Sequence, residues 1–477
     1  MPTIPERMPF IGGRSRPTGR ILDVRAPQSG DPVTRVHRSG PAEIEAAIDA
    51  SVQGFEAMRG APAHRRAGIL LKISEEVARR REELAGILAL EAGKPLKAGR
   101  AEVDRCAHTF QVASEEAKRL GGEVIPFDVV PWGEGRLGVL RRFPLGPIAG
   151  ITPFNFPLNL TAHKIAPAIA AGASIVIKPA SQTPSPAILL AEIAAGAGAP
   201  PGAVNVVPAA AADVGPLVED DRLRMLTFTG SPVVGWDLKR RAPRKRVTLE
   251  LGGNAGAIVC AGASLDHAAD RIVFGGFSYA GQSCISVQRV LVERPAWDRF
   301  MDILTARVRD LRLGDPTEEA TDVGPMISVA EAERAEAWIG EALGGGAEIA
   351  TGGRRRDAFL EPTILTRTTP EMKVNCLEIF APVVTATPFD DLEEALRIVN
   401  DSRYGLQAGI FTRDVEAVWR AYETLEVGGV VINDVPSFRV DHMPYGGVKD
   451  SGTGREGLRW AIEEMTEPRL LVWTRLG

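Results

Sequence analysis

From Gly146 to Leu251, short apolar segments alternate with helical segments, and this pattern constrains the fold more than any other feature of the chain. Strands of near-continuous apolar character, separated by helices of about ten residues, predict a parallel sheet covered by helices on both faces. The predicted strands are 147–152, 174–178, 203–207, 225–229 and 246–251, and the predicted helices are 158–171, 186–196, 213–219 and 231–241. A sheet of this class binds nucleotides at the carboxyl ends of its strands.

The segments on either side of this sheet differ from it in pattern. After Gly252-Gly253 a second α/β region extends to residue 445, with predicted strands at 289–293, 348–350, 383–387 and 408–411 and a helix at 297–311. Residues 1–40 are rich in Gly, Pro and Arg and are expected to form an arm that packs on the body. Apolar residues at three- and four-residue spacing predict helices beginning at Pro41, at 63–91 and at 98–119.

Residues 122–143 have the alternating charged and apolar character of two strands around a loop. The last segment, 455–477, predicts a helix followed by a strand-like tail at 469–474. A ribbon placed between helical and α/β segments is expected to project from the body and to pair with another subunit.

The composition of the chain argues against several classes of partner and binding site. With 477 residues the chain exceeds the size at which one hydrophobic core stops growing, so more than one domain is expected. The net charge of −5 argues against nucleic acid as the main partner. Four cysteines and six histidines without ligand spacing predict no structural metal and a reducing compartment, and no apolar run is long enough to span a membrane. The simplest interpretation is a cytoplasmic protein with neither a nucleic-acid nor a membrane partner.

One cysteine lies in an unusual setting. Cys284 follows Gly281-Gln-Ser283, and small residues allow a close approach of ligand and backbone, while Gly281 can adopt a positive φ. A thiol on such a turn has the exposure that a nucleophile needs. Taken alone, a free cysteine is more often a small buried hydrophobe.

Polar residues at strand ends supply the other candidates. Glu250 lies in an otherwise apolar strand, where a carboxylate needs a partner or a raised pKa, and it is a candidate general base. Asn155 follows a strand and can donate to an oxyanion, although an Asx turn explains it equally well. Lys178 ends a strand where a nucleotide would lie. Gly230 and Ser231 open a helix whose N-terminus suits a pyrophosphate, although Ser231 is also an ordinary helix cap.

Thiol, base, amide donor and nucleotide site together suggest acyl chemistry through a thioester, linked to hydride transfer. At these residues the sequence closely resembles the aldehyde dehydrogenase superfamily, and the match covers nearly the whole chain in order. The matching motifs are Pro153-Phe-Asn-Phe-Pro157, Ile177-Lys-Pro-Ala180, Phe228-Thr-Gly-Ser231, Leu249-Glu-Leu-Gly-Gly253, Gly281-Gln-Ser-Cys284, Glu378-Ile-Phe-Ala-Pro382 and Pro444-Tyr-Gly-Gly-Val-Lys-Asp-Ser-Gly452.

The resemblance implies an architecture. It consists of a Rossmann-like parallel-sheet cofactor domain (1–121 and 144–252), an α/β catalytic domain (253–454) and a small β oligomerisation ribbon and tail (122–143 and 455–477). The implied assembly is a homodimer or homotetramer.

The resemblance also implies a covalent mechanism. Cys284 would attack the aldehyde, Asn155 and the Cys284 backbone N–H would stabilise the oxyanion, and Glu250 would activate water to hydrolyse the thioester. Lys178 and Glu378 would bind the two ribose units of NAD or NADP. The remaining cofactor residues implied by the motifs are Thr152, Pro153, Phe154, Ser181, Gly230, Ser231, Leu251 and Phe380.

Two departures from the family's pattern affect specificity. Members that prefer NAD commonly carry Glu where this chain has Ser181, so we expect NADP to be accepted, with a preference for it left open. Members that oxidise succinate semialdehyde typically carry Arg where His163 stands, so a dicarboxylic semialdehyde is disfavoured.

The sequence around His163 and His442 looks more like lactaldehyde, glyceraldehyde and phosphonoacetaldehyde dehydrogenases. Arg439 and His442 are therefore candidates to meet a small hydroxylated or anionic aldehyde, and a position in a surface loop is the alternative for both. For the whole protein, a CoA-acylating relative and a non-catalytic structural protein on the same fold are the alternatives. Glu250 as a water-activating base favours hydrolysis, and the intact Cys284, Glu250 and Asn155 argue against a non-catalytic protein.

Overall fold

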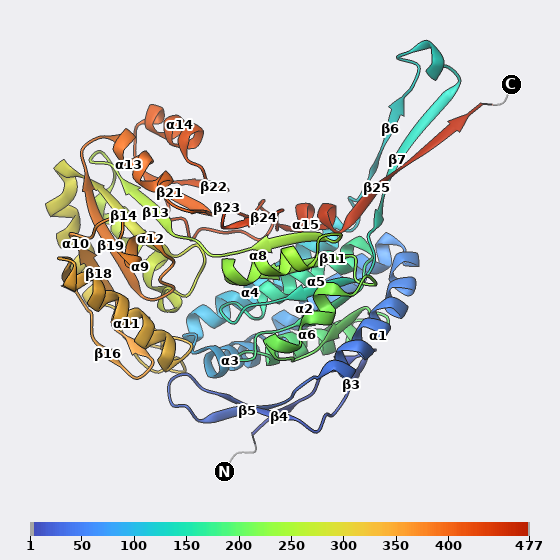
Figure 1. Ribbon diagram of the computed structural model, residues 1–477, viewed down its shortest axis with the longest axis horizontal. Coiled ribbons are helices and arrows are strands. Elements are labelled where there is room, and N and C mark those ends of the chain that lie inside the picture. The colour runs from blue at the N-terminus through green and yellow to red at the C-terminus, as the bar shows by residue number, and fades with distance from the viewer. Residues whose placement is uncertain (1–3, 476–477) are drawn as a thin grey trace.

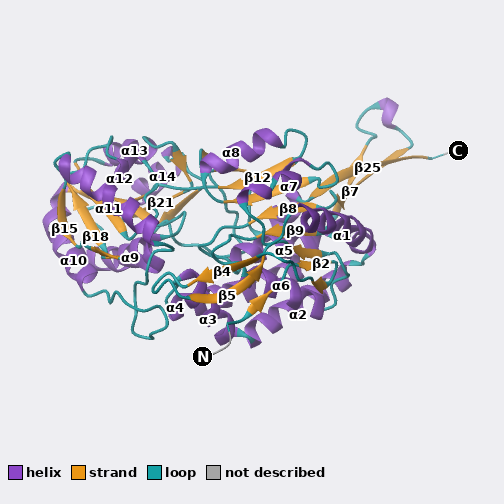
Figure 2. Ribbon diagram, turned by 60° about the horizontal axis from the view of Figure 1, so that its bottom comes forward, coloured by secondary structure: helices purple, strands orange, loops and turns teal. Residues whose placement is uncertain are grey.

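The computed structural model describes residues 4–475 and contains two large sheets, each between layers of helices (Figures 1 and 2). The strand order in the first sheet is β24 (Gly452–Thr453), β12 (Arg246–Glu250), β11 (Met225–Thr229), β8 (Ile148–Ile151), β9 (Ile175–Lys178), β10 (Val204–Val206), β2 (Phe10–Ile11) and β3 (Arg14–Ser15). From β12 to β10 all pairs are parallel. Since β8 and β9 lead to one side and β11 and β12 to the other, the strand order reverses between β8 and β11, where doubly wound sheets place their ligand crevice.

Alternate residues of these strands face two different cores, as the near-continuous apolar pattern predicts. Ile175 and Ile177 pack on one face, against α2 (Ala63–Arg79), α5 (Asn159–Ala171) and α6 (Ser185–Gly196). Val176 packs on the other face, with α1 (Pro41–Gly60), α7 (Gly215–Glu219) and α8 (Pro232–Arg241). The predicted parallel sheet with two covered faces is therefore confirmed.

The second sheet has the order β15 (Glu348–Thr351), β18 (Thr363–Thr366), β19 (Val383–Phe389), β14 (Val287–Glu293), β13 (Ala255–Val259), β21 (Gln407–Phe411) and β22 (Gly429–Ile432). One face is covered by α9 (Leu265–Phe277), α10 (Trp297–Arg309) and α11 (Val329–Gly344), and the other by α13 (Leu392–Asn400) and α14 (Val415–Thr424). Residues 251–254 alone connect β12 of the first sheet to β13 of the second. The division of the chain into domains stays a proposal. Strand β24 belongs to the segment 253–454 that was assigned to the catalytic domain, but it pairs with β12 of the first sheet.

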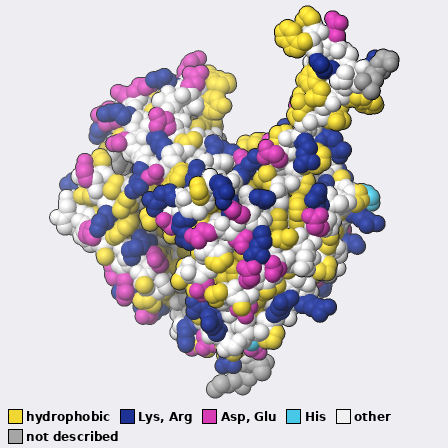
Figure 3. Space-filling model, turned by 45° about the vertical axis from the view of Figure 1, so that its right-hand side comes forward, with side chains coloured by type: hydrophobic (Ala, Val, Ile, Leu, Met, Phe, Trp, Pro, Cys, Tyr) yellow, Lys and Arg dark blue, Asp and Glu magenta, His cyan; other side chains and the backbone are white. Residues whose placement is uncertain are grey.

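The strands predicted in 122–143 are β6 (Gly122–Pro126) and β7 (Arg136–Pro144). The tail is β25 (Thr466–Thr474), longer than predicted, and it pairs antiparallel with β7 from Thr466 opposite Pro144 to Thr474 opposite Arg136. Figure 1 shows this three-stranded ribbon projecting from the body, and Figure 3 shows hydrophobic side chains along it. The N-terminal arm is a small sheet of β1 (Glu6–Arg7), β5 (Pro32–His37) and β4 (Ile21–Arg25).

One helix prediction is wrong. The segment 63–91 is not one helix, because α2 ends at Arg79 and α3 (Arg81–Ala92) begins after Arg80, whose φ of −95° and ψ of 21° interrupt the helix. A break at a single residue leaves the apolar spacing on each side intact, so periodicity does not reveal it. The next helix, α4, spans Leu96–Glu116. No helix between residues 4 and 475 combines the length and apolar character needed to cross a membrane.

Candidate active site

Cys284 lies in the loop between α9 and β14, on a backbone that is held in an unusual conformation. Tyr279, Ala280 and Gly281 all have positive φ, of 50°, 52° and 65°. Such a φ costs about 1–3 kcal/mol at a non-glycine residue and persists only where surrounding contacts enforce it. The Tyr279 hydroxyl donates to the carbonyl of Ala92 at 2.9 Å. The loop leaves Cys284 partly exposed, unlike Cys106, which is buried in α4.

Among residues 4–475 the thiol has one polar side-chain partner, the hydroxyl of Tyr445, 3.0 Å from Sγ. Burial raises the pKa of Cys284 to about 12, while the Tyr445 hydrogen bond and the charge of Arg439 act against this shift. At neutral pH the sulfur therefore carries its proton, and its activation requires a base or a further stabilising group.

Two glycines allow Cys284 and Glu378 to lie against the end of β12. A Cβ on Gly253 would lie 2.2 Å from the carbonyl oxygen of Cys284, and a Cβ on Gly252 would lie 2.3 Å from Oε2 of Glu378. The N–H of Gly253 donates to Oε1 of Glu378 at 2.9 Å. Burial raises the pKa of Glu378 to about 7, and this hydrogen bond opposes the rise. The two sheets thus meet where β12 ends, with residues of both at the junction.

Asn155 lies beside the same loop. Its Nδ2 donates to the carbonyl of Gln282 at 3.0 Å, and its Oδ1 is buried without a hydrogen-bond partner among the described residues. Its own carbonyl accepts a bond of 2.7 Å from Nζ of Lys94. This hydrogen bond links Asn155 to the loop that carries Cys284, although Asn155 and Gln282 are 127 residues apart in the sequence.

Lys94 belongs to a buried pair that helical periodicity does not predict, because residue 94 lies between the helices expected at 63–91 and 98–119. Lys94 pairs with Glu102, and both side chains are fully buried. The carboxylate of Glu102 also accepts the N–H groups of Leu158 and Asn159, at 2.9 and 3.1 Å, at the start of α5. The pair therefore fixes the segment that carries Asn155.

Glu250 is at the carboxyl end of β12, 2% exposed, and neither carboxylate oxygen has a partner within the described chain. Burial and the nearby negative charge of Glu456 raise its pKa well above the ordinary value. Glu456, in contrast, forms buried ion pairs of 3.2 Å with Lys164 and with Arg439. A buried carboxyl without a fixed partner can take up and release a proton, as the predicted general base must.

The three substrate candidates occupy different positions. His163 is buried, with Nε2 2.8 Å from Asp441, which also pairs with Arg105 at 2.8 Å. Arg439 is buried with its guanidinium 3.7 Å from the ring centroid of Tyr445. His442 is exposed, with its ring edge-to-face against that of His108 at 6.2 Å. Of the three, His442 alone reaches the surface.

The cofactor candidates gather at the carboxyl ends of the first sheet, where β8, β9, β11 and β12 end at Ile151, Lys178, Thr229 and Glu250. The N–H of Thr152 bonds to the carbonyl of Lys178 at 3.1 Å, and that of Gly230 bonds to the carbonyl of Glu250 at 3.0 Å. Next to these ends lie Pro153, Phe154, Ser181, Ser231, Leu251 and Phe380. Phe154 and Phe380 meet edge-to-face at 5.9 Å, Leu251 is buried, and Ser181 and Ser231 are exposed.

Lys178 is 8% exposed and has no carboxylate partner in residues 4–475. Burial and, to a smaller extent, the positive charge of Arg38 lower its pKa to about 8. Arg38 lies next to Ser39, whose N–H bonds to the carbonyl of Pro208 just beyond β10. Arg38 has no recognisable signal in the sequence, because it reaches the sheet edge from the N-terminal arm. Two cations without an anionic partner at this edge suit a phosphate-bearing ligand.

Two surface hollows lie away from this site. A surface hollow of about 520 Å³ lies at the foot of the ribbon, near Arg119, Arg141 and Arg459, and another of about 690 Å³ lies beside α10. Neither includes Cys284. Across residues 4–475 no three His, Cys, Asp or Glu side chains are grouped so as to hold a metal ion.

Comparison with known proteins identifies the family. A sequence model described as "Aldehyde dehydrogenase family" matches residues 14–471. The chain is 43% identical over 464 residues to 3-sulfolactaldehyde dehydrogenase of Priestia megaterium, covering 97% of each chain. It is 41% identical over 457 residues to lactaldehyde dehydrogenase of Methanocaldococcus jannaschii, covering 94% of this chain and 97% of that one.

Solved structures agree with these relatives. The fold matches an aldehyde dehydrogenase from Physcomitrella patens in complex with the reaction product succinate, at a TM-score of 0.98 and 42% identity, covering 100% of this chain and 99% of that one. It also matches a glyceraldehyde-3-phosphate dehydrogenase from Methanocaldococcus jannaschii complexed with NADP, at a TM-score of 0.92 and 40% identity, covering 96% and 100%. With the family's motifs at the meeting point of the two sheets, the chain belongs to the aldehyde dehydrogenase family.

Proposed function

We propose that the protein oxidises a small aldehyde to a carboxylic acid with NAD or NADP, through a thioester on Cys284. The observation that carries this proposal is the junction at Gly252-Gly253. There the nucleophile loop, Glu378 and the end of the nucleotide-binding sheet lie in direct contact.

Cys284, Asn155 and Glu250 each have a defined step in the proposed reaction. The Cys284 sulfur adds to the aldehyde carbon, and the Asn155 amide with the Cys284 N–H donates to the resulting oxyanion. A nicotinamide bound at the sheet edge would supply the hydride acceptor that oxidation of this adduct to a thioester on Cys284 requires. Glu250 then takes a proton from water, which attacks the thioester carbon, and the acid leaves as the Cys284 sulfur is released. The buried setting of Glu250 favours this role, because an isolated carboxyl there exchanges its proton without breaking an ion pair.

The residues at the sheet edge fit a dinucleotide. The unpartnered ammonium of Lys178 and the charge of Arg38 favour a 2′-phosphate, and Ser181 adds a hydroxyl donor in place of a repelling carboxylate. The exposed Ser231 immediately precedes α8 as its N-cap, and the N-terminal N–H groups of this helix suit a pyrophosphate. We therefore propose that NADP is accepted alongside NAD.

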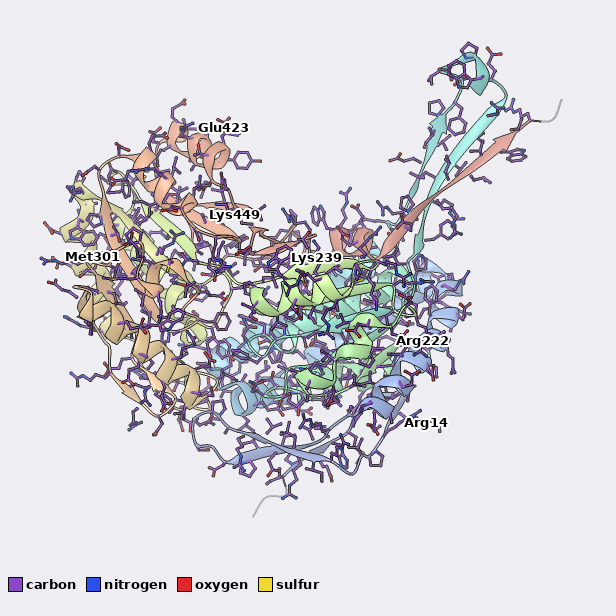
Figure 4. The ribbon with its side chains drawn as sticks, in the orientation of Figure 1. Arg14, Arg222, Lys239, Met301, Glu423 and Lys449 are labelled. Carbon is purple, nitrogen blue, oxygen red and sulfur yellow. The ribbon has the colours of Figure 1, made fainter. Side chains whose placement is uncertain are left out.

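Cofactor selectivity is tested by Ser181→Glu, which should lose the use of NADP and keep that of NAD. Arg38→Ala should raise the KM for NADP with little effect on that for NAD. Arg14→Ala, on the exposed strand β3, is the matched control (Figure 4). An unchanged NADP to NAD ratio in Ser181→Glu would contradict this part of the proposal.

For the substrate we propose a small hydroxylated or anionic aldehyde. Relatives named for 3-sulfolactaldehyde and for lactaldehyde support this class. We assign direct contact to the exposed His442, and assign the buried His163 and Arg439 to the wall behind the site. A panel of aldehydes with each cofactor, with products analysed in the presence and absence of CoA, tests the reaction. Acyl-CoA as the main product would show that the acyl group is transferred to CoA and not to water.

We also propose that the ribbon of β6, β7 and β25 joins subunits in a homodimer or homotetramer. Its surface carries large apolar side chains, among them Trp132, 75% exposed, and Trp473, 64% exposed. Contiguous exposed apolar surface of this kind marks protein interfaces. Because a nucleophilic thiol must stay reduced, we further propose the cytoplasm as the location.

A further inference from the structure

The phenol of Tyr445 is the polar side chain that touches the reacting sulfur, and no step of the proposed mechanism uses it. We propose that Tyr445 is a catalytic residue: its hydroxyl donates a hydrogen bond to the Cys284 thiolate and sets the fraction of reactive sulfur, with Arg439 behind its ring as a positioning residue. This inference rests on the proposed function in one respect, the role of Cys284 as nucleophile.

The position of the hydroxyl is fixed by the backbone and by packing. Tyr445 is 3% exposed, and its Oη lies 3.0 Å from Sγ of Cys284. Its N–H bonds to the carbonyl of Glu456 at 3.0 Å, and the N–H of Glu456 bonds back at 2.7 Å. The ring packs with Ile285 and Leu406, so the phenol has little freedom to turn away from the sulfur.

The segment that follows Tyr445 is anchored as well. Lys449 in β23 (Val448–Lys449) donates to the carbonyl of Asn400 at 2.8 Å and pairs with Glu426 at 2.7 Å (Figure 4). Hydrogen bonds thus hold the chain on both sides of the phenol.

Arg439 places a positive charge on the ring. Its guanidinium lies 3.7 Å from the Tyr445 ring centroid and is held by Glu456 at 3.2 Å, while Nη2 lies 3.4 Å from Nε2 of His163. A cation over an aromatic face is attracted to it, most strongly when desolvated. It also withdraws electron density from the phenol, which makes the O–H a stronger donor. The buried network of Arg439, Glu456 and His163 thereby gains a function in supporting this donor.

The chemistry of the sulfur requires such a donor. A thiolate in a dry site is costly unless hydrogen bonds stabilise it. Burial keeps the Tyr445 hydroxyl protonated, because it raises its pKa well above the ordinary value. The charged groups that act on Cys284 are Glu378 and Glu250, which disfavour the thiolate, and Arg439, which favours it.

The proton balance is simple. When Sγ–H loses its proton to solvent, the contact with Tyr445 becomes an O–H donating to a sulfur anion. No other bond forms or breaks. Hydrogen bonds to ionised groups are roughly twice as strong as neutral ones, so the contact shifts the thiol equilibrium towards the thiolate.

Alkylation measures this equilibrium directly. The full-length protein, without cofactor, is treated with iodoacetamide from neutral to alkaline pH, and modification of the Cys284 peptide is followed by mass spectrometry. Following the peptide is necessary because Cys376 is exposed and Cys260 partly exposed. Tyr445→Phe should raise the midpoint of the rate profile by about one pKa unit, a roughly tenfold slower reaction at neutral pH. Tyr422→Phe, an exposed tyrosine on α14, should leave it unchanged.

The positioning role of Arg439 is tested by replacing it with and without the Tyr445 hydroxyl present. Arg439→Met should raise the midpoint in the wild-type background and raise it by a smaller amount in the Tyr445→Phe background, where only the direct charge of Arg439 on the sulfur is lost. Arg439→Lys, which keeps the charge, should shift it less. If these variants do not fold, a further measurement still tests the proposal. Replacing all four tyrosines by 3-fluorotyrosine makes the phenol a stronger donor without removing it, and should lower the midpoint.

The outcomes separate the two proposals. An unchanged alkylation midpoint in folded Tyr445→Phe, or in the fluorotyrosine protein, overturns the role of Tyr445 whatever the activity. Full dehydrogenase activity in Cys284→Ser overturns the thioester mechanism instead.

Discussion

At the residue scale, the buried carboxyl groups of Glu250 and Glu456 differ in protonation because their partners differ. Glu456 loses solvation on burial, but Lys164 and Arg439 outweigh that cost and lower its pKa to about 2. Glu250 has no cation bonded to it, and burial together with Glu456 raises its pKa. One group is therefore a permanent anion, and the other is free to exchange a proton.

A pH dependence follows from the raised pKa of Glu250. The base form is the carboxylate, so steady-state turnover should rise with pH through a midpoint well above the ordinary value of 4.5. Glu250→Gln should remove this rise and lower kcat by roughly 10²–10⁴. The first-turnover burst of reduced cofactor should persist, because thioester formation precedes hydrolysis. Stopped-flow absorbance measures both phases.

The exposed Glu423 on α14, labelled in Figure 4, provides the control Glu423→Gln, which should behave as wild type. If Glu250→Gln loses both the burst of reduced cofactor and the steady-state turnover, Glu250 acts before thioester formation, as the base that activates the thiol.

Asn155 contributes through one amide. Asn155→Ala should lower kcat/KM by roughly 10²–10³, the cost of one oxyanion donor. Thermal unfolding should change little, since the amide makes one hydrogen bond, to the carbonyl of Gln282. Activity within a factor of about two of wild type would show that Asn155 only shapes the turn.

At the element scale, the start of α5 depends on a buried ion pair from a different part of the chain. Lys94 precedes α4 and Glu102 lies within it, and the carboxylate accepts two N–H groups at the N-terminus of α5. The Lys94 ammonium also lies 3.7 Å from the ring centroid of Phe156. These contacts fix α5 and the Asn155 turn as one unit.

Removing one partner of this pair leaves the other as an uncompensated buried charge. Glu102→Gln or Lys94→Met should each reduce the free energy of unfolding by about 3–5 kcal/mol, measured by urea denaturation. The double variant should lose less than the sum of the two, because neither charge is then stranded. Strictly additive losses would show that the two side chains act independently.

The exposed pair Arg403 and Asp450, 2.7 Å apart, gives the matched comparison. Arg403→Met should cost no more than about 1 kcal/mol, the ordinary range for a surface ion pair.

At the scale of the whole molecule, the ribbon exposes apolar surface that the body does not cover. On β25 Leu471 is 57% exposed and Trp473 64% exposed. The double variant Leu471→Glu/Trp473→Glu should reduce the solution mass to that of one chain, measured by light scattering after size exclusion. A wild-type protein that already has the mass of one chain would contradict the proposed assembly. Val329→Glu, at an exposed apolar position on α11, should retain the wild-type mass.

The sequence by itself determined the parallel sheets and supplied the candidate site residues at strand ends. Apolar runs and helical spacing are local properties, and burial on two faces forces them. Lys178 and Asn155 were predicted because a parallel sheet places the carboxyl ends of its strands along one edge, and Glu250 because it is a carboxylate in an apolar strand. The single-residue break at Arg80 escaped this reasoning, since it leaves the spacing intact.

Tertiary structure alone decided which distant groups meet. The hydroxyl of Tyr445 reaches Cys284 across 161 residues, Arg105 reaches Asp441 across 336, and Arg38 acts on Lys178 from the N-terminal arm. No periodicity encodes such contacts, because they depend on how two sheets and an arm pack together. The sequence thus predicted Cys284 as the nucleophile, and packing determined which groups contact its sulfur.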